Sequence, residues 1–345
     1  MSINKRVLIS GITGQDGSLL ANHLLREGLE VSGTFRRGSE NNLWRLEEMG
    51  ILQDLKLYDY TIGSNSIELA KIISNEYDYI FHLAGDSFTE DSFRHPYKTI
   101  SINLTGCLEI LENSLEYSPE SKIFIACSSE IYGKQLNNIN LVTENSPRNP
   151  LNPYGISQST NLDVSRLFRN TYSQFVSVGI LFNHESEYRG AQFLTRKIST
   201  GLSLIKNGSK QVLSLGNLNS SRDWGSAKEY VKVFKKILDH NEPDDYIIAT
   251  GKSTTVRQIV LMCCAVIGFD PEFQGEGKNE ICIDRKTGKT IIKISPEYFR
   301  KMETPCLTGS TDKVSSQIGW SPQVPVSDVI EQMCEADLKR LVNTK

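Results

Sequence analysis

The stretch VLISGITGQDGSLLANHLLREG, residues 7–28, decides the fold. Its apolar start predicts a buried strand, and the segment 18–28 has the apolar periodicity of a helix that ends at Gly28. Between them, glycines three residues apart allow a tight turn and a close approach of the backbone to a pyrophosphate, which the N–H groups of the helix start would bind. We therefore expect dinucleotide binding by the residues of this turn, namely Gly11, Thr13, Gly14, Gln15, Asp16 and Gly17.

The second apolar segment, EVSGTF at 30–35, ends at Arg36 and Arg37. Dinucleotide-binding folds that take NAD carry an aspartate or glutamate here, which accepts hydrogen bonds from the ribose hydroxyls. Arginine instead suits a phosphate dianion, because its planar guanidinium pairs with two oxygens at once. The two arginines therefore favour NADP(H) over NAD(H). The alternative is a solvated basic turn.

Short apolar runs continue through the first half of the chain and alternate with amphipathic segments such as 105–117. Strands at this spacing predict βαβ units, and their nearly continuous apolar character indicates burial on both faces of a parallel sheet. The predicted fold class is α/β, a Rossmann doubly wound parallel sheet with helices on both faces. The runs are VLIS (7–10), EVSGTF (30–35), YIFHLA (79–84), KIFIACSS (122–129) and FVSVGILF (175–182).

The pattern changes after about residue 183. We interpret the later pieces as a smaller carboxyl-terminal substrate lobe. The expected division is a dinucleotide-binding domain of residues 1–183, joined by elements that cross back from later in the chain, and a lobe formed mostly by residues 184–345. The pieces are a helix candidate near 191–207, a strand VLSLG, a helix from Ser226 and a stretch containing glycine and lysine around 271–295.

The composition argues against several classes of protein. The 345 residues are 39% hydrophobic and 23% charged, with a formal net charge of -3. No basic tract indicates nucleic acid or an anionic membrane, and no apolar run approaches the ~18 residues of a membrane span. Seven cysteines without a Cys-x-x-Cys pair indicate reduced thiols in a cytoplasmic protein. We expect no nucleic-acid partner, no membrane association and no metal.

A hydroxyl and a carboxylate follow the strand predicted at 122–129. Ser128 and Glu130 lie at its carboxyl end, and Tyr154 lies about twenty residues later at the start of a predicted helix. Ligands of open α/β sheets bind at the carboxyl ends of the strands, so Ser128 and Tyr154 can converge on one substrate carbon above the nicotinamide. In the alternative interpretation, Glu130 is a carboxylate at a helix start and Tyr132 is packing.

With these motifs the sequence resembles the extended short-chain dehydrogenases/reductases, and within them the GDP-mannose 4,6-dehydratases. The resemblance runs from about residue 5 to the carboxyl terminus. Segments such as LFNHES, TRKI and RDWG are much narrower than the general dinucleotide-binding pattern. The matching segments are SGITGQDGS, TFRR, SSEIYG, PYGIS, GILFNHES, FLTRKIS, LGNLNSSRDWGSAKEYV, IATG and IGWSP.

The resemblance implies an NADP-dependent lyase that removes water from a nucleotide sugar, with a GDP-linked sugar favoured, in deoxysugar biosynthesis. Tyr154 would contact the cofactor and act as acid and base at the hydroxyl of carbon 4, while Ser128 bonds the same oxygen and hydride passes to NADP. Glu130 would then take the proton of carbon 5 as water leaves carbon 6, and hydride would return to carbon 6. Removing a proton beside a carbonyl is work that a positioned carboxylate can do.

The resemblance also implies substrate-binding residues and self-association. Asn183, Lys197 and Arg222 match positions that contact the nucleotide diphosphate, and Arg300 matches a further phosphate-binding arginine. Ser87 matches a serine near the hexose. Relatives form dimers and tetramers, so we expect a homodimer or homotetramer.

The most important departure from the family pattern is Gln158, four residues after Tyr154, where the family has a lysine. The lysine charge lowers the pKa of the tyrosine and its ammonium bonds the nicotinamide ribose, whereas glutamine replaces only the hydrogen bonds. An unassisted tyrosine has a pKa of about 10, so forming its phenolate at pH 7 costs roughly 4 kcal/mol. We expect oxidation, which needs a base, to be weakened more than reduction.

Three smaller departures lie near the expected pocket. Asp86, Glu90 and Asp91 stand where the family has uncharged residues, which suggests either a different glycosyl group or a surface that faces solvent. The segment LYDYTIGSN lacks the Gly-Asp pair usual after the third strand, which leaves Asp59 as a weak candidate for the adenine contact. The proline usual after Arg300 is absent.

Three functions stay open on the sequence. A nucleotide-sugar 4,6-dehydratase is the leading hypothesis. A nucleotide-sugar 4-reductase or epimerase on the same scaffold is one alternative, and a non-catalytic NADP(H)-binding protein is another, both motivated by Gln158. The retention of Ser128, Glu130 and Tyr154 together argues against the non-catalytic alternative.

Overall fold

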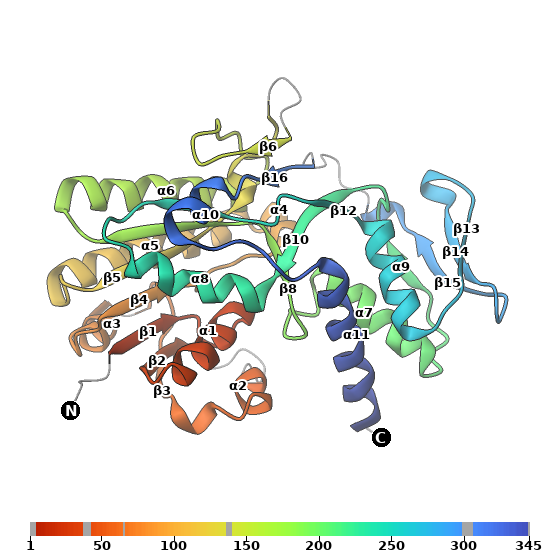
Figure 1. Ribbon diagram of the computed structural model, residues 1–345, viewed down its shortest axis with the longest axis horizontal. Coiled ribbons are helices and arrows are strands. Elements are labelled where there is room, and N and C mark those ends of the chain that lie inside the picture. The colour runs from red at the N-terminus through yellow and green to blue at the C-terminus, as the bar shows by residue number, and fades with distance from the viewer. Residues whose placement is uncertain (1–4, 37–42, 65, 136–139, 299–305, 344–345) are drawn as a thin grey trace.

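A seven-stranded parallel sheet forms the centre of the computed structural model, which describes residues 5–36, 43–64, 66–135, 140–298 and 306–343 (Figure 1). In the strand order β11-β7-β5-β4-β1-β2-β3, successive strands are added on one side up to β3 and on the other side from β4 onward. Ligands of such sheets bind at this switch point, between β1 and β4. The predicted Rossmann doubly wound parallel sheet is therefore confirmed. Its strands are β1 (Arg6–Ser10), β2 (Glu30–Phe35), β3 (Lys56–Asp59), β4 (Tyr79–His82), β5 (Lys122–Ser128), β7 (Val176–Leu181) and β11 (Asp245–Ile248).

Two helical layers cover the sheet, and β1 shows how the sequence builds both. Val7 and Ile9 pack into the core on one face of the sheet, whereas Leu8 between them packs into the core on the other face. All three are fully buried, which explains why the strand is apolar without alternation. The first face is covered by α1 (Gln15–Arg26) and α8 (Ala227–Asp239), and the second by α3 (Ser66–Ile73), α5 (Pro96–Tyr117) and α6 (Pro153–Tyr172) (Figure 1).

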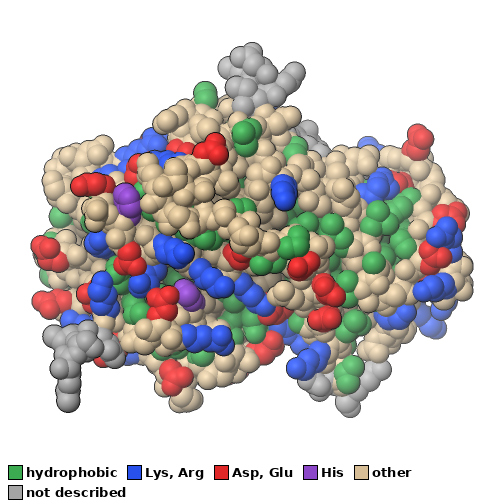
Figure 2. Space-filling view, viewed as in Figure 1, with side chains coloured by type: hydrophobic (Ala, Val, Ile, Leu, Met, Phe, Trp, Pro, Cys, Tyr) green, Lys and Arg blue, Asp and Glu red, His purple; other side chains and the backbone are tan. Residues whose placement is uncertain are grey.

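The helix α8 has an apolar side that faces the sheet and a charged side that faces solvent. Its inner side buries apolar residues such as Val233, Phe234 and Ile237 against the sheet. Lys232 and Lys236 are exposed on its outer side, and Figure 2 shows positively charged side chains gathered over this helix. The helix predicted from Ser226 is thus an amphipathic cover of the sheet.

A smaller lobe lies beyond the carboxyl ends of the strands and has its own hydrophobic core. The helix expected near 191–207 is α7 (Leu194–Lys206), and the strand expected at VLSLG is β9 (Leu213–Leu215). The stretch around 271–295 forms the strands β13 (Pro271–Gln274), β14 (Ile281–Asp284) and β15 (Lys289–Ile294), which extend a sheet with β9. The helices α9 (Val256–Ile267) and α11 (Val326–Asn343) complete the lobe.

The two parts of the molecule are joined by several chain crossings. The elements α8 and β11, which follow the smaller lobe's first helix in sequence, return to the central sheet. A small sheet of β8 (Asn183–Glu185), β10 (Ser221–Ser226) and β12 (Ser253–Thr255) lies between the parts, and β6 (Leu141–Val142) pairs with β16 (Thr308–Gly309). The division at residue 183 stays a prediction.

Asp245 at the start of β11 fixes the edge of the sheet to α6. This carboxylate is 3% exposed and accepts hydrogen bonds from Arg166 Nε and Arg169 Nη2, each at 2.6 Å. The two arginines are one turn apart on α6, so one carboxylate anchors the helix at two points. The position of α6 on the sheet depends on this buried ion pair.

Two properties of the chain as a whole follow from the described residues. Among them, no helix combines the length and the apolar character that crossing a bilayer requires. All seven cysteines are free thiols, and only Cys306 is partly exposed.

We predict that Asp245→Asn lowers the free energy of unfolding by about 3 to 5 kcal/mol, because two guanidiniums lose the buried charge that pairs with them. Urea denaturation followed by circular dichroism measures this loss. Asp163→Asn is the control, since Asp163 pairs with Arg148 at an exposed site and should change the free energy by less than about 1 kcal/mol. Equal effects of the two substitutions would contradict the anchoring role of Asp245.

Candidate active site

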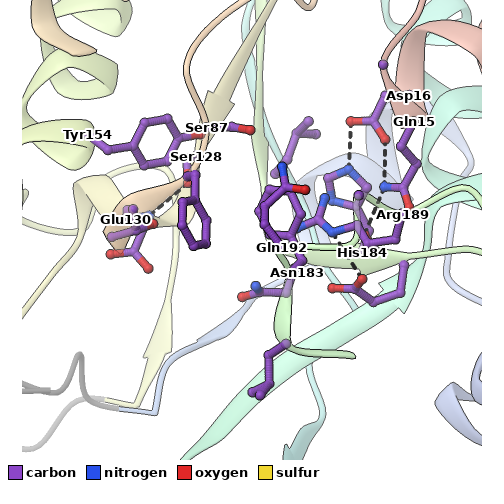
Figure 3. A pocket seen from close by; sticks show the side chains of 18 of the residues that line it. Gln15, Asp16, Ser87, Ser128, Glu130, Tyr154, Asn183, His184, Arg189 and Gln192 are labelled. Carbon is purple, nitrogen blue, oxygen red and sulfur yellow. Dashed lines mark hydrogen bonds and ion pairs between the residues drawn. The ribbon is translucent and has the colours of Figure 1, made fainter. Parts of the chain in front are cut away.

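A cleft of about 930 Å³ runs along the carboxyl ends of the central strands and into the smaller lobe (Figure 3). Its size lies near the upper end of the range for small-molecule and cofactor sites. The glycine turn after β1 lines one end, the residues that follow β5 line the middle, and residues of β8, α7 and β10 line the other side. The predicted site residues that the structure describes all line this cleft: Gly11, Thr13, Gly14, Gln15, Asp16, Gly17, Arg36, Ser87, Ser128, Glu130, Tyr154, Gln158, Asn183, Lys197 and Arg222.

At Gly11 and Gly17 the glycine turn is packed too tightly to hold a side chain. Gly11 has φ +83°, and a Cβ atom on it would lie 2.8 Å from the backbone of Ala84. A Cβ atom on Gly17 would lie 2.3 Å from the carbonyl oxygen of Gly11. Gly14 begins α1 without a side-chain cap, so the first N–H groups of this helix open onto the cleft. This is a cradle for an anion at a helix start.

The side chains of Gln15 and Asp16 are engaged by the protein itself. Gln15 Nε2 donates to the carbonyl oxygen of His184 at 3.1 Å, and Ser186 Oγ donates to Gln15 Oε1 at 2.9 Å. Asp16 Oδ2 lies 2.8 Å from His184 Nε2, and His184 Nδ1 lies 2.6 Å from the carbonyl oxygen of Phe182 (Figure 3). The turn of the first domain is thereby tied to β8.

Burial and charge act in opposite directions on this pair. Burial acts to raise the pKa of Asp16, but the neighbouring His184 and Arg189 outweigh it and hold the pKa below its ordinary value of 3.8. Burial acts to lower the pKa of His184, but the charge and hydrogen bond of Asp16 outweigh it and raise the pKa above 6.5. The pair is therefore charged between these two values.

Ser128, Glu130 and Tyr154 meet in the middle of the cleft (Figure 3). Ser128 ends β5, and its Oγ accepts the backbone N–H of Glu130 at 3.2 Å in the short turn Ser129–Ile131. A Cβ atom on Gly155 would lie 2.6 Å from the carbonyl oxygen of Glu130, so only glycine lets the start of α6 approach this turn. Burial raises the pKa of the Tyr154 phenol above its usual range, although its hydrogen bond with Ser128 acts to lower it.

Asn152 organises this group, and we did not identify it from the sequence. Its Oδ1 accepts the N–H of Gly155 at 2.7 Å and caps α6, while its Nδ2 donates to Glu130 Oε2 at 2.7 Å. One amide thus fixes both the helix that carries Tyr154 and the carboxylate opposite. The available signal was an asparagine directly before Pro153, the first residue of a helix, which is typical of an N-cap.

Gln158 lies one turn beyond Tyr154 on α6 and also lines the cleft. The residue is 7% exposed, and its Oε1 atom has no hydrogen-bond partner among the described residues. A buried amide oxygen without a donor costs free energy in the free protein. The position one turn after Tyr154 is therefore polar and neutral.

Of the three acidic residues that depart from the family pattern, one lines the cleft and two lie beside Lys98. Glu90 lines the cleft with Ser87. Asp86 instead accepts a hydrogen bond from Thr99 Oγ1 at 3.1 Å and lies 3.5 Å from Lys98 Nζ, which also lies 3.6 Å from Asp91. Two of the three carboxylates thus share one cation, Lys98.

The far side of the cleft carries the cations expected for a diphosphate. Lys197 Nζ lies 3.6 Å from the ring centre of Tyr298, and Arg222 Nη1 donates to the carbonyl oxygen of Ser221 at 2.7 Å. Asn183 lies beside them at the start of β8. The predicted residues Arg37 and Arg300 lie outside the described part of the chain.

Several cleft residues were missed by the sequence analysis because distant elements bring them together. Arg189 lies 3.1 Å from Glu185 Oε2 and stacks on Phe193, and Arg45 reaches the glycine turn from the short helix α2 (Trp44–Glu48). Asp59, the weak candidate for the adenine contact, ends β3 and is not one of the described residues that line the cleft. Within the described ranges, no group of three or more histidine, cysteine or acidic residues could hold a metal ion.

Comparison with known proteins gives consistent matches over the whole chain. The family model described as GDP-mannose 4,6 dehydratase matches residues 8–333. GDP-mannose 4,6-dehydratases of Yersinia enterocolitica and Sinorhizobium fredii are each 36% identical to the chain. The first match covers 97% of this chain and 94% of the relative, and the second covers 100% of both.

Solved structures resemble this fold at lower sequence identity. The dTDP-glucose 4,6-dehydratase DesIV of Streptomyces venezuelae, solved with NAD, has a TM-score of 0.81 at 20% identity and 96% coverage of both chains. The UDP-glucose 4-epimerase of Thermotoga maritima has a TM-score of 0.80 at 20% identity, covering 97% of this chain and 99% of its own. These likenesses establish the fold.

We predict that the Asp16–His184 pair stabilises the protein most between about pH 4 and pH 6.5. Folding lowers the pKa of Asp16 below 3.8 and raises that of His184 above 6.5, so both groups favour the folded state in this window. The contribution fades as the pH falls through the lowered pKa of Asp16 or rises through the raised pKa of His184. Thermal unfolding of the wild type and His184→Gln from pH 4 to pH 9 measures the difference.

His23→Gln is the control for this pH dependence. Burial foremost lowers the pKa of His23, so protonation of this residue opposes folding and its replacement should stabilise the protein at low pH. The two substitutions should therefore change the melting temperature in opposite directions below pH 6.5. A His184→Gln difference that does not vary with pH would show that the pair is not charged.

Proposed function

Because the chain belongs to the GDP-mannose 4,6-dehydratase family, we propose that it is an NADP-dependent nucleotide-sugar 4,6-dehydratase that acts on a GDP-linked sugar. The observation that carries the proposal is the meeting of Ser128, Glu130 and Tyr154 in one cleft with the glycine turn. A hydroxyl, a phenol and a separate carboxylate supply what oxidation and elimination on one sugar require. A simple reductase needs no such carboxylate.

The residues of the chain divide the proton transfers of this reaction. Tyr154 takes the proton of the hydroxyl on carbon 4, and Ser128 holds the same oxygen by a hydrogen bond. A nicotinamide dinucleotide held at the glycine turn would supply the hydride acceptor for carbon 4 and the hydride donor for carbon 6. Glu130 takes the proton of carbon 5, which the ketone acidifies, and passes it to the hydroxyl of carbon 6, which leaves as water. When hydride returns to carbon 6, carbon 5 receives the proton that Tyr154 took from the hydroxyl of carbon 4. The hydrogen bond from Asn152 keeps the Glu130 carboxylate aimed at its task.

The glycine turn and Arg36 support NADP as the cofactor. The turn leaves no room for a Cβ atom at Gly11 or Gly17, which suits the close approach of a pyrophosphate. Arg36 follows β2 and lines the cleft where NAD-binding relatives of this fold carry an acidic residue. A guanidinium at this position pairs with a 2′-phosphate.

The cations of the far side support a nucleotide diphosphate as the substrate handle. Lys197, Arg222 and Asn183 offer two positive charges and an amide donor to the diphosphate. A contribution of Arg300, which lies outside the described residues, stays a prediction. The names of the relatives favour GDP as the nucleotide and mannose as the sugar. The Lys197 ammonium lies over the Tyr298 ring, which holds it at the edge of this subsite.

Self-association is part of the proposed function. The neighbouring helices α5 and α6 expose large apolar side chains, with Tyr97 at 85%, Leu167 at 52% and Ile156 at 45%. Apolar side chains on two packed helices suit a second copy of the chain. A homodimer through these helices is the simplest assembly.

The assay for the proposed function is incubation of the purified protein with NADP⁺ and GDP-mannose, followed by detection of a 4-keto-6-deoxy sugar by mass spectrometry. Glu130→Gln keeps the hydrogen bond from Asn152 but removes the base, so kcat should fall by about 10² to 10⁴. Oxidation at carbon 4 does not need Glu130, so reduced cofactor should still appear on mixing, as absorbance at 340 nm. Glu116→Gln, at the exposed end of α5, is the control. No product from any GDP-, CDP-, UDP- or dTDP-sugar would refute the dehydratase.

We predict that Gln158→Lys shifts the acid limb of the kcat–pH profile to lower pH and raises turnover at pH 7. The phenol must lose its proton to act as base, and burial raises its pKa, so the wild-type rate should climb with pH. An ammonium one turn away favours the phenolate and lowers that pKa. Gln158→Met tests the hydrogen bond of residue 158 to the cofactor separately from a charge at this position. This variant should bind the cofactor more weakly, whereas the acid limb of its kcat–pH profile should stay where it is in the wild type.

Gln158 also gives the test that separates the dehydratase from the second candidate function. A nucleotide-sugar 4-reductase starts from a neutral phenol that donates its proton, and an epimerase could work with a slow oxidation step. A neutral side chain at residue 158 therefore suits either of them better than it suits a dehydratase. Unchanged dehydration in Gln158→Lys, together with reduction of a 4-keto sugar by the wild type and NADPH, would favour that candidate.

A further inference from the structure

Glu90 is a half-buried carboxylate that lines the cleft and has no partner in the described part of the protein. It belongs to the short helix α4 (Thr89–Arg94), and the three residues before it, from Ser87 to Thr89, line the cleft as well. Among the described residues, its side chain takes part in no hydrogen bond and no ion pair. A carboxylate that the protein leaves unsatisfied beside a ligand cleft suits a ligand that brings hydrogen-bond donors.

The two neighbouring carboxylates differ from Glu90 in being paired with a cation. Lys98 Nζ lies 3.5 Å from Asp86 and 3.6 Å from Asp91. Neither Asp86 nor Asp91 is among the described residues that line the cleft. Arg94, one turn after Glu90 on α4, is exposed and forms no ion pair with it. Of the three acidic residues in this segment, the structure therefore leaves Glu90 alone available to a ligand.

The segment Ser87–Glu90 starts from a point that is bound to the first turns of α6. Asn103 Oδ1 accepts the backbone N–H of Asp86 at 2.7 Å, and Asn103 Nδ2 donates to the carbonyl oxygen of Asp86 at 3.1 Å. The same Nδ2 donates to Ser157 Oγ at 2.9 Å, and Ser157 Oγ donates to the carbonyl oxygen of Tyr154 at 2.7 Å. The helix α4 also packs on α6. The segment therefore begins beside the turn that carries Tyr154 (Figure 3).

The same segment contacts the smaller lobe through an aromatic pair. Phe88 packs edge-on against Phe193, with the ring centres 5.8 Å apart. Phe193 is the N-cap of α7, and its carbonyl oxygen accepts the backbone N–H of Lys197 at 2.8 Å. The segment Ser87–Glu90 thus forms the wall of the cleft between the turn of α6 with Tyr154 and the turn of α7 with Lys197.

This wall lies where the proposed function places the hexose. Carbon 4 must lie at Tyr154 and Ser128, and carbon 5 at Glu130. Carbon 1 carries the diphosphate, which Lys197 and Arg222 would hold. The hydroxyl of carbon 6 leaves in the reaction, so the donors left for recognition are those on carbons 2 and 3. An ionised carboxylate is a pure acceptor and forms stronger hydrogen bonds than a neutral group does.

We propose that Glu90 is a specificity-determining residue, which accepts a hydrogen bond from a donor on carbon 2 or carbon 3 of the glycosyl group. The donor is a hydroxyl or an ammonium, and either one binds a carboxylate better than it binds the uncharged residue of the family pattern. This role concerns the substrate of the proposed function and rests on that function. Glu90 itself takes no part in the proton transfers, which Tyr154 and Glu130 carry out.

The experiment measures ligand binding to the wild type, Glu90→Gln and Glu90→Ala by calorimetry. Each protein is saturated with NADPH, which cannot accept a hydride, so that the sugar is bound without being converted. Loss of a hydrogen bond to a charged group should weaken the binding of GDP-mannose to Glu90→Ala by roughly 10- to 100-fold. Glu90→Gln keeps a neutral acceptor and should lose less. The affinity for GDP, which has no sugar, should stay unchanged in both variants.

Deoxy analogues of GDP-mannose identify the carbon that carries the donor. The 2-deoxy or the 3-deoxy analogue, whichever lacks the bonded hydroxyl, should bind the wild type and Glu90→Ala equally well. The role of Glu90 is overturned if the three proteins bind GDP-mannose equally. It is also overturned if Glu90→Ala weakens GDP as much as GDP-mannose, or if both deoxy analogues keep the full difference between the wild type and Glu90→Ala.

Amino analogues of GDP-mannose distinguish the two kinds of donor. If the wild type binds the 2-amino-2-deoxy or the 3-amino-3-deoxy analogue more tightly than GDP-mannose, and Glu90→Gln loses this preference, the donor is an ammonium. If the wild type binds both amino analogues no better than GDP-mannose, the donor is a hydroxyl.

Asp91→Asn is the matched control, because this carboxylate of the same helix lies beside Lys98 and is not among the described residues that line the cleft. It should leave the affinity for every ligand unchanged. Glu90→Ala should not lower the melting temperature of the free protein, since no contact among the described residues depends on this carboxylate. A lower melting temperature together with weaker binding of GDP would show a structural role only.

Product formation by the wild type distinguishes the failure of this role from the failure of the proposed function. A wild type that neither binds nor converts any GDP-linked sugar would remove the dehydratase and with it the role of Glu90. A wild type that releases a 4-keto-6-deoxy product, with a Glu90→Ala variant that binds GDP-mannose equally well, would remove only the role of Glu90.

Discussion

The close approach of Gly17 to the carbonyl oxygen of Gly11 is the constraint on which the rest of the structure depends. Because no side chain separates them, α1 starts directly on the turn that follows β1, at the point where the sheet reverses its winding. That start carries Gln15 and Asp16, which hold the backbone and the ring of His184. His184 belongs to β8, which pairs with β10, and β10 leads into α8. One close contact between glycines thus places the helix start that binds β8, a strand of the small sheet between the two parts of the molecule.

The cleft separates its charges according to the two kinds of chemistry it would support. Arg36 and Arg45 stand at the cofactor end, and Lys197 and Arg222 stand at the end of the smaller lobe. Between them lie the neutral or acidic groups that would handle protons, with Glu130 held by an uncharged amide and Tyr154 followed by an uncharged glutamine. Phosphates bind best to fixed cations, whereas a base or acid works best when its pKa is set by a few local contacts.

The sequence predicted the central strands well because they are buried on both faces, which leaves a simple apolar signature in VLIS or KIFIACSS. It did not identify β11, whose four residues begin with a charged aspartate, and it began the helix of 105–117 too late, since α5 starts at Pro96. Motifs predicted that Ser128, Glu130 and Tyr154 would lie together, and they do. Asn152, His184 and Arg45 were missed, because their contacts join residues far apart in sequence. Such contacts leave no periodic pattern in the local sequence. The roles of all these residues stay predictions.

The placement of β11 has a consequence for synthesis on the ribosome. β7 is an edge of the sheet until β11 pairs with it, and β11 is translated only after α7, β9, β10 and α8. During that interval one edge of β7 is unpaired in the nascent chain. Its sequence, VSVGIL, is buried throughout in the folded protein, and an exposed apolar edge of this kind can pair wrongly with another chain. Arrival of Asp245 between Arg166 and Arg169 closes that edge and locks it with charge. The central sheet therefore cannot be completed before the first elements of the smaller lobe have been made.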